Sequence, residues 1–258
     1  MPLPDSPRVI YAKNPLDEVI CQLRFPPILR IDSEIPAVFQ EAIRGEYPLL
    51  QEQDVLGQPG IPDQISKLLG NIINRGTRTY NFISVDQLWQ VSLTRDFLAL
   101  TCKRYTRWEE FRAHLRLPLE ALVAEYRPAY YSRVGLRYRD VIVRSKLDLA
   151  NSSWSELLQP QIAAELSSAI ADRIQDVTRV FLLQLDEYAG KLNVQHGTAS
   201  SEVKEQCYFI DGDYFTENRT EIANANETLD YFNRQAGRLF RWCITDQLHR
   251  AMEPTPVA

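Results

Sequence analysis

The sequence is poor in the residues and patterns that usually identify an enzyme. It has three histidines and four cysteines, and none of them stands beside another at the spacing of a metal site or of a nucleophile with its base. The motifs GxSxG, GxGxxG and HExxH and the phosphate-binding loop are missing. Catalysis is therefore less expected than binding, and no cofactor is predicted.

Long apolar runs and an excess of basic residues are missing too. No stretch reaches the roughly 18 apolar residues of a membrane-spanning helix, and the first residues lack the pattern of a secretory signal. Scattered cysteines in apolar surroundings are typical of buried thiols in a reducing compartment. These features predict a cytoplasmic protein with no membrane partner. The net charge of −5 argues against a broad nucleic-acid-binding surface, so nucleic acid is not an expected partner.

A repeated order of elements is the clearest feature that the sequence does have. Residues 131–143, YSRVGLRYRDVIV, alternate apolar and charged side chains as a half-buried strand does, and residues 19–31 resemble a weaker copy. Aligning Leu23 with Leu136 gives an offset of 113 residues. The sequence predicts an extended arm over 1–15 and two α+β repeats, over 16–128 and 129–258. Each repeat should run strand, helix, three strands, helix.

The expected elements have the following bounds. In the first repeat they are a strand at 19–25, a helix after Ser33, strands at 79–84, 88–94 and 97–103, and a helix at 108–126 that Pro118 should kink. In the second they are the strand at 131–143, a helix at 155–170, strands at 177–185, 190–196 and 205–215, and one long helix at 226–252. Residues 51–76 are expected to form a long connection, with helical periodicity only at 65–73.

Helices with one apolar stripe each must cover one face of a curved antiparallel sheet. This order of elements resembles the duplicated architecture of the TATA-binding protein, with helix-grip folds as the alternative, and a resemblance of fold carries no function. The segments 133–138 (RVGLRY), 14–19 (NPLDEV) and 210–214 (IDGDY) resemble an uncharacterised, sporadically distributed prokaryotic family of similar length. That resemblance implies no activity, and the patchy distribution fits genes of defence systems or mobile elements.

The candidate ligand-binding residues are arginines on the two matching strands. They are Arg24, Arg133, Arg137 and Arg139. If these strands lie side by side, the guanidinium groups form a row at the centre of the sheet that suits a carboxylate or a phosphate. In the alternative interpretation, Asp17, Glu18 and Asp140 pair with them across the strands.

Asp211 and Asp213 are the candidate metal ligands. Carboxylates two residues apart on a strand point to the same face and can share a divalent cation, with Glu217 nearby. The alternative is that these acids only mark the solvated face of a strand next to an Asp-Gly turn.

Three functions remain open. The sequence favours a non-enzymatic binding or interaction protein, an accessory component of a defence or mobile-element system, whose sheet receives a protein partner or a second copy of the chain. The first alternative is a sensor that encloses a small anionic ligand between the sheet and the long helices, with Arg24 and Arg137 as its anion-binding residues. The second is a metal-dependent hydrolase that uses Asp211 and Asp213.

Overall fold

The structure is a computed structural model that describes residues 3–53, 78–200 and 205–257. Its strands are β1 Val9–Tyr11, β2 Leu16–Arg24, β3 Leu49–Gln53, β4 Thr79–Ile83, β5 Trp89–Leu93, β6 Phe97–Cys102, β7 Arg133–Ile142, β8 Thr178–Gln184, β9 Lys191–Ser200, β10 Gln206–Thr216 and β11 Pro254–Pro256. Its α-helices are α1 Arg30–Ser33, α2 Ala37–Ile43, α4 Trp108–Tyr126, α5 Trp154–Leu157, α6 Pro160–Ala163, α7 Ala225–Cys243 and α8 Asp246–Ala251. Short 3₁₀ turns lie at Arg144–Leu147, Ala164–Ser167, Ala171–Arg173 and Ile222–Asn224.

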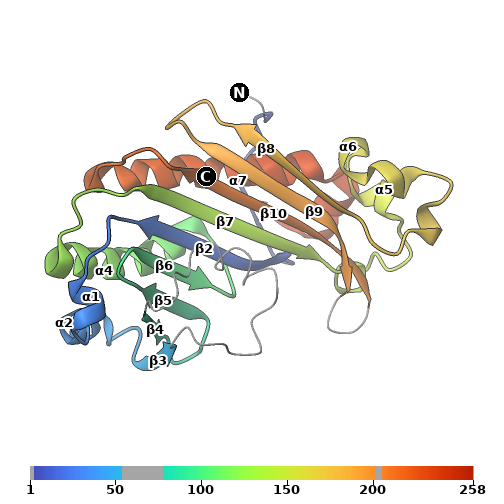
Figure 1. The fold of residues 1–258 in the computed structure, drawn as a ribbon. Coiled ribbons are helices and arrows are strands. Elements are labelled where there is room, and N and C mark those ends of the chain that lie inside the picture. The colour runs from blue at the N-terminus through green and yellow to red at the C-terminus, as the bar shows by residue number, and fades with distance from the viewer. Residues whose placement is uncertain (1–2, 54–77, 201–204, 258) are drawn as a thin grey trace.

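One antiparallel sheet of nine strands runs through the described part of the chain. Its strand order is β3-β4-β5-β6-β2-β7-β10-β9-β8 (Figure 1). The strands β1 and β11 pair separately. The helices α4 and α7 lie together on one side of this sheet (Figure 1). The α+β class and the antiparallel sheet that the sequence predicts are therefore confirmed.

The two strands that the sequence comparison matched, β2 and β7, are neighbours at the centre of the sheet. Their register places Cys21 opposite Leu136, Gln22 opposite Gly135 and Leu23 opposite Val134. The offset of 113 aligns Gln22 with Gly135, so these two matched residues are also direct partners in the sheet. On either side, strands are added in mirrored order, β6 to β3 beyond β2 and β10 to β8 beyond β7.

The main core lies between the sheet and these two helices. On α7, Leu229, Phe232 and Leu239 recur at helical spacing and are fully buried or nearly so. On α4, Phe111 and Leu115 do the same. Because each helix has a single apolar stripe, each covers the sheet on one side and presents its charged residues outward.

Two helices differ from the sequence prediction for identifiable reasons. The helix expected at 226–252 is two helices, because Ile244 is extended and pairs with Leu158 in an isolated bridge. The chain then restarts as α8, where the Thr245 side chain accepts a hydrogen bond from the amide of Leu248. The expected helix at 155–170 is likewise broken into α5, α6 and 3₁₀ turns, since Leu158 is extended and Pro160 begins a new helix. In contrast, α4 continues through Pro118.

Three strands were not expected from the sequence. The strand β3 occupies the start of the stretch read as a long connection, and it pairs with β4. The strands β1 and β11 join the first and last parts of the chain, with Val9 opposite Pro256 and Tyr11 opposite Pro254. Part of the arm is therefore docked as a strand against the last described residues, and Leu3 is buried. The helical periodicity at 65–73 lies outside the described residues.

Candidate functional site

The arginines singled out from the sequence lie on the sheet face that points away from α4 and α7. Arg24 is opposite Arg133 across the central strand pair, and Arg137 and Arg139 follow on β7 at the two-residue period of a strand. The structure brings these side chains to one part of the sheet. The helices α4 and α7 cover the other face of the sheet. A ligand bound between the sheet and these helices therefore does not contact the four arginines.

Acids of β10 neutralise two of these arginines. Nε of Arg137 donates to Oδ1 of Asp211 at 2.8 Å, and its Nη2 donates to the other carboxylate oxygen. Nη2 of Arg133 lies 3.0 and 2.9 Å from the two carboxylate oxygens of Asp213. Arg133 reaches across Gly135, where a Cβ would lie only 2.1 Å from its Nη1. The centre of the arginine row is thus paired across strands, but with acids of β10 and not with Asp17, Glu18 or Asp140, the partners suggested by the sequence.

The other two arginines are less tightly held. Arg139 lies 3.6 Å from the half-exposed Asp17. Arg24 forms no ion pair with any residue that the structure describes, and burial lowers its pKa. Asp140, which we expected among the partners of these arginines, faces the opposite side of the sheet. The ligand-binding roles of the four arginines stay predictions.

The predicted metal ligands share a face but are occupied. Asp211 and Asp213 each accept hydrogen bonds from an arginine, as described above. Among residues 3–53, 78–200 and 205–257, no group of three or more histidine, cysteine, aspartate or glutamate side chains is placed to hold a metal ion. A carboxylate that already binds a guanidinium group is a poor ligand for a cation, so the geometry favours the two ion pairs.

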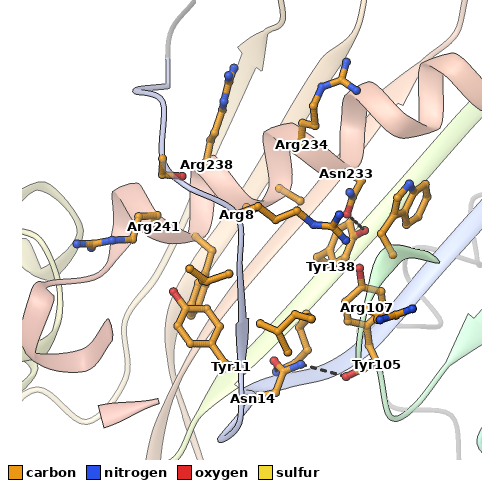
Figure 2. A pocket seen from close by; sticks show the side chains of 18 of the residues that line it. Arg8, Tyr11, Asn14, Tyr105, Arg107, Tyr138, Asn233, Arg234, Arg238 and Arg241 are labelled. Carbon is orange, nitrogen blue, oxygen red and sulfur yellow. Dashed lines mark hydrogen bonds between the residues drawn. The ribbon is translucent and has the colours of Figure 1, made fainter. Parts of the chain in front are cut away.

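A cavity of about 300 Å³ lies on the helix-covered side of the sheet, beneath the N-terminal arm. Its walls come from four distant parts of the chain: the arm and the start of β2, the residues that lead into α4, the middle of β7, and the second half of α7 (Figure 2). Ligand pockets in proteins have volumes of this order. We refer to this space as the arm cavity.

Asp140 of β7 lies at the sheet side of the arm cavity. The residue is only 7% exposed, and its carboxyl group has no hydrogen-bond or ion-pair partner among the residues that the structure describes. Burial raises the pKa of Asp140 well above its ordinary value, and the charge of Asp211 on the opposite face adds to this effect. Asp140 is therefore a carboxyl group that the fold buries without a partner and leaves facing an open space.

The other polar groups around Asp140 are largely fixed by each other. The hydroxyl of Tyr138 donates to Oδ1 of Asn233 at 2.8 Å, and Nδ2 of Asn14 donates to the carbonyl of Tyr105 at 3.0 Å (Figure 2). The hydroxyl of Tyr11 shares a hydrogen bond of 2.8 Å with a ring nitrogen of His249, and burial raises the pKa of Tyr11 to about 12. These contacts hold a preformed wall of tyrosine rings around the cavity.

Arginines surround the outer part of the arm cavity. The arginine rim consists of Arg8, Arg107, Arg234, Arg238 and Arg241. Three of them follow each other at intervals of four and three residues, which places them along one side of α7. In Figure 2 the side chain of Arg8 extends toward Asn233 and Tyr138, whereas those of α7 point outward. The cavity thus has a cationic opening and, among its described lining residues, a single acid.

Arg8 connects the arm to the start of α4. Its Nη1 and Nη2 donate to the two carboxylate oxygens of Glu109 at 2.6 and 2.8 Å. This hydrogen bonding lowers the pKa of Glu109 to about 2. The forked pair fixes the guanidinium group at the cavity and leaves its three other N–H groups, one each on Nε, Nη1 and Nη2, for a ligand.

The arginines of α7 differ in how far they are already neutralised. Arg238 pairs with Asp5 of the arm, and Arg241 pairs with Asp246. Arg234 forms no ion pair with any described residue and lies over the ring of Tyr231, 5.9 Å from its centroid. Arg234 is therefore the rim residue most available to an anion.

Sequence reasoning missed this site for two reasons. The wall depends on the docking of the arm against α7 and β11, which no local pattern indicates. The rim was visible as a row of arginines at helical spacing in the last long helix, but such rows usually mark a solvated face. The sequence did contain one indication of the site, because Asp140 falls in the apolar row of β7.

Comparisons with known proteins add no identification. No protein-family model matches the chain, and a search of curated proteins finds no significant match. None of the helices in the described ranges is long and apolar enough to cross a lipid bilayer.

Proposed function

We propose that the chain is a non-enzymatic binding protein that holds a small anionic ligand in the arm cavity. The observation that carries this proposal is the arginine rim around a preformed cavity of about 300 Å³. Guanidinium groups bind carboxylates and phosphates with fixed geometry, and Arg234 is the rim residue that forms no ion pair with a described residue. The cavity lies between the sheet and the long helices, where a sensor of an anion would hold its ligand, although its arginines are not Arg24 and Arg137.

The lining of the cavity favours binding over catalysis. The described residues that line it include no histidine and no cysteine, and the tyrosine and asparagine groups named above are engaged in internal hydrogen bonds. A general base or nucleophile has to be free to exchange a proton; Asp140 meets this condition, but no second acid or base of the described lining lies free beside it to complete a catalytic pair. Rigid donors and aromatic rings, by contrast, are what a binding site requires.

We further propose that the two halves of the fold are tandem copies in the manner of the TATA-binding protein. The mirrored strand order and the pairing of Gln22 with Gly135, at the offset that aligns the halves, support this proposal. The halves differ in that the first contributes one more strand, β3. In this interpretation the arm cavity has walls from both halves but is not repeated, because the arm has no counterpart in the second half.

A thermal-shift screen tests the proposed function. The purified full-length chain is heated with phosphorylated and carboxylated metabolites, each over a series of concentrations. At a hundred times its Kd, a ligand stabilises by about 2.7 kcal/mol, which raises Tm by roughly 5–11 °C for a chain of this size. We expect at least one anion to do so, and we expect Arg8→Ala and Arg234→Ala to reduce the shift.

The matched control is Arg116→Ala. Arg116 is an exposed arginine of α4 that is not part of the cavity, and it pairs only loosely with Glu120 at 3.9 Å. Its loss should leave the ligand-induced shift unchanged. If no anion gives a saturable shift, or if Arg116→Ala weakens the shift as much as the rim variants do, the proposed function is wrong.

The edge strand β8 favours a second function, pairing with another copy of the chain. Val180 and Leu182 are 61% and 60% exposed on this strand, which ends the sheet. The ladder with β9 uses the backbone groups of alternate residues, with the amide of Leu185 donating to Gly190 and the carbonyl of Val177 accepting from Thr198. The alternate residues of β8 that do not bond to β9 point their N–H and C=O groups away from the sheet, toward solvent. A second β8 in antiparallel orientation would satisfy these groups and cover both aliphatic side chains.

Size-exclusion chromatography with light scattering tests this pairing. We expect the wild-type chain to form dimers as concentration rises, and the double variant Val180→Lys/Leu182→Lys to remain monomeric. Ile170→Lys, which changes an equally exposed aliphatic residue away from the edge, is the control and should still dimerise. A wild-type chain that stays monomeric at every concentration would contradict the proposal.

A further inference from the structure

The unpartnered carboxyl group of Asp140 gives information on the ligand itself, provided that the proposed function holds. Its neighbours on the same face of β7, Leu136, Tyr138 and Ile142, are all buried, and two of them are aliphatic. An apolar residue is what the position favours, because burying a polar group without a hydrogen bond destabilises the fold. Proteins depart from such local rules mainly at functional sites.

No group of the described chain relieves this cost. The guanidinium of Arg8 is held by Glu109, and that of Arg241 donates to the carbonyl of Ile244 and to Asp246. Both arginines line the cavity, yet neither forms a bond with Asp140. The carboxyl group and the rim are therefore two separate recognition elements of one cavity, one able to accept hydrogen bonds from an N–H group and the other able to bind an anion.

We propose that the ligand of the arm cavity is a small aromatic or heterocyclic anion that carries an amino group, with its anionic group at the arginine rim and its N–H donor on the Asp140 carboxyl. Aromatic side chains in the lining support the choice of a planar ligand. Tyr11 and Phe240 meet edge to face with ring centroids 5.8 Å apart, as do Tyr105 and Tyr138 at 5.7 Å, and all four line the cavity.

This chemistry has two common sources, an aminated nucleotide and an aromatic amino carboxylate. Adenosine 5′-monophosphate and 4-aminobenzoate serve as the respective probes. Purine riboside 5′-monophosphate and benzoate are the matched compounds that lack only the amino group, and adenosine lacks only the phosphate. Comparing the pairs separates the two sources and assigns each functional group of the probe to one end of the cavity.

Calorimetric titration of the full-length chain with these five probes tests the inference. A hydrogen bond that satisfies a buried, otherwise unpaired acceptor changes affinity by roughly fivefold to a hundredfold, so one aminated probe should bind that much more tightly than its matched compound. In Asp140→Leu this ratio should fall to about one, while the dependence on the anionic group persists. Asp140→Asn keeps the size of the side chain and one acceptor, and it should retain part of the ratio even if the leucine variant folds poorly.

The outcomes separate the two levels of the proposal. If a probe and its matched compound bind equally well to the wild-type chain, and Arg234→Ala weakens both, the anion site stands and the role of Asp140 is wrong. A ratio that survives in Asp140→Leu would also overturn that role. If none of the five probes binds saturably, the ligand class proposed here is wrong, whereas the wider metabolite screen decides the proposed function.

Discussion

Replacing Asp140 with asparagine should stabilise the unliganded protein at neutral pH. The buried carboxyl has a pKa well above its ordinary value in the folded state, whereas in the unfolded chain it ionises near pH 4. A group with a raised folded-state pKa contributes its full stability below the unfolded pKa and loses it as the pH rises toward the folded pKa. Wild-type stability should therefore fall from about pH 4 upward because of this residue, and an asparagine does not share that loss.

The expected size of the stabilisation by Asp140→Asn follows from the burial of the wild-type carboxyl group without a partner. Each unit by which burial raises the pKa costs about 1.4 kcal/mol once the pH exceeds the folded value. A buried polar group that lacks a hydrogen bond typically costs about 1–3 kcal/mol, which corresponds to roughly 2–12 °C in Tm for a chain of this length. Asp211 on the opposite face adds its charge to this effect, whereas burial raises the pKa of the nearby Tyr11, Tyr214 and Cys243, so these three are neutral in this range and leave the trend intact.

Thermal unfolding of both proteins between pH 4 and pH 8 measures this effect. The gap in Tm should open as the pH rises and should be small at the acidic end. Asp17→Asn is the matched control, because Asp17 is a half-exposed aspartate on the neighbouring strand that lies 3.6 Å from Arg139, and its substitution should not stabilise the protein at pH 7. If Asp140→Asn is less stable than the wild type at pH 7, then the carboxylate has a stabilising partner in the folded protein, and the reasoning fails.

Two further substitutions test the sheet. Arg137→Met leaves Asp211 buried without its partner and should cost about 3–5 kcal/mol in urea unfolding, while the double variant Arg137→Met/Asp211→Leu should recover most of that loss; equal losses in both would contradict a buried ion pair. Gly197→Ala should destabilise by about 1–3 kcal/mol in thermal unfolding, because its Cβ would lie 1.9 Å from the carbonyl oxygen of Val177 and force β9 away from the start of β8; an unchanged Tm would show that the two segments separate freely.

The sequence predicted the sheet well because its strands carry period-two patterns. The segment at 88–94 alternates clearly, whereas those at 79–84 and 97–103 are apolar stretches next to turns, and each became a strand with bounds close to those expected. The long helices were equally clear. What failed was decided by long-range contacts. The break after Cys243 arises because Ile244 pairs with Leu158, more than eighty positions earlier, and β1 exists only because β11 lies beside it. A local sequence pattern does not indicate pairing between segments that are so far apart in the chain.

The candidate site was missed for a narrower reason, which lies in the parity of positions along β7. The odd-numbered residues Arg137 and Arg139 face away from the helices, and the even-numbered Tyr138 and Asp140 face them. The alternation was visible in the sequence, and it already assigned Tyr138 to the apolar row. Asp140 follows Tyr138 by two positions, so the same period places its carboxyl in that row and not among the arginines. An acid among the buried positions of a central strand is therefore the observation that leads to the arm cavity. The carboxyl group of Asp140 faces this open space and is not fully enclosed by apolar side chains.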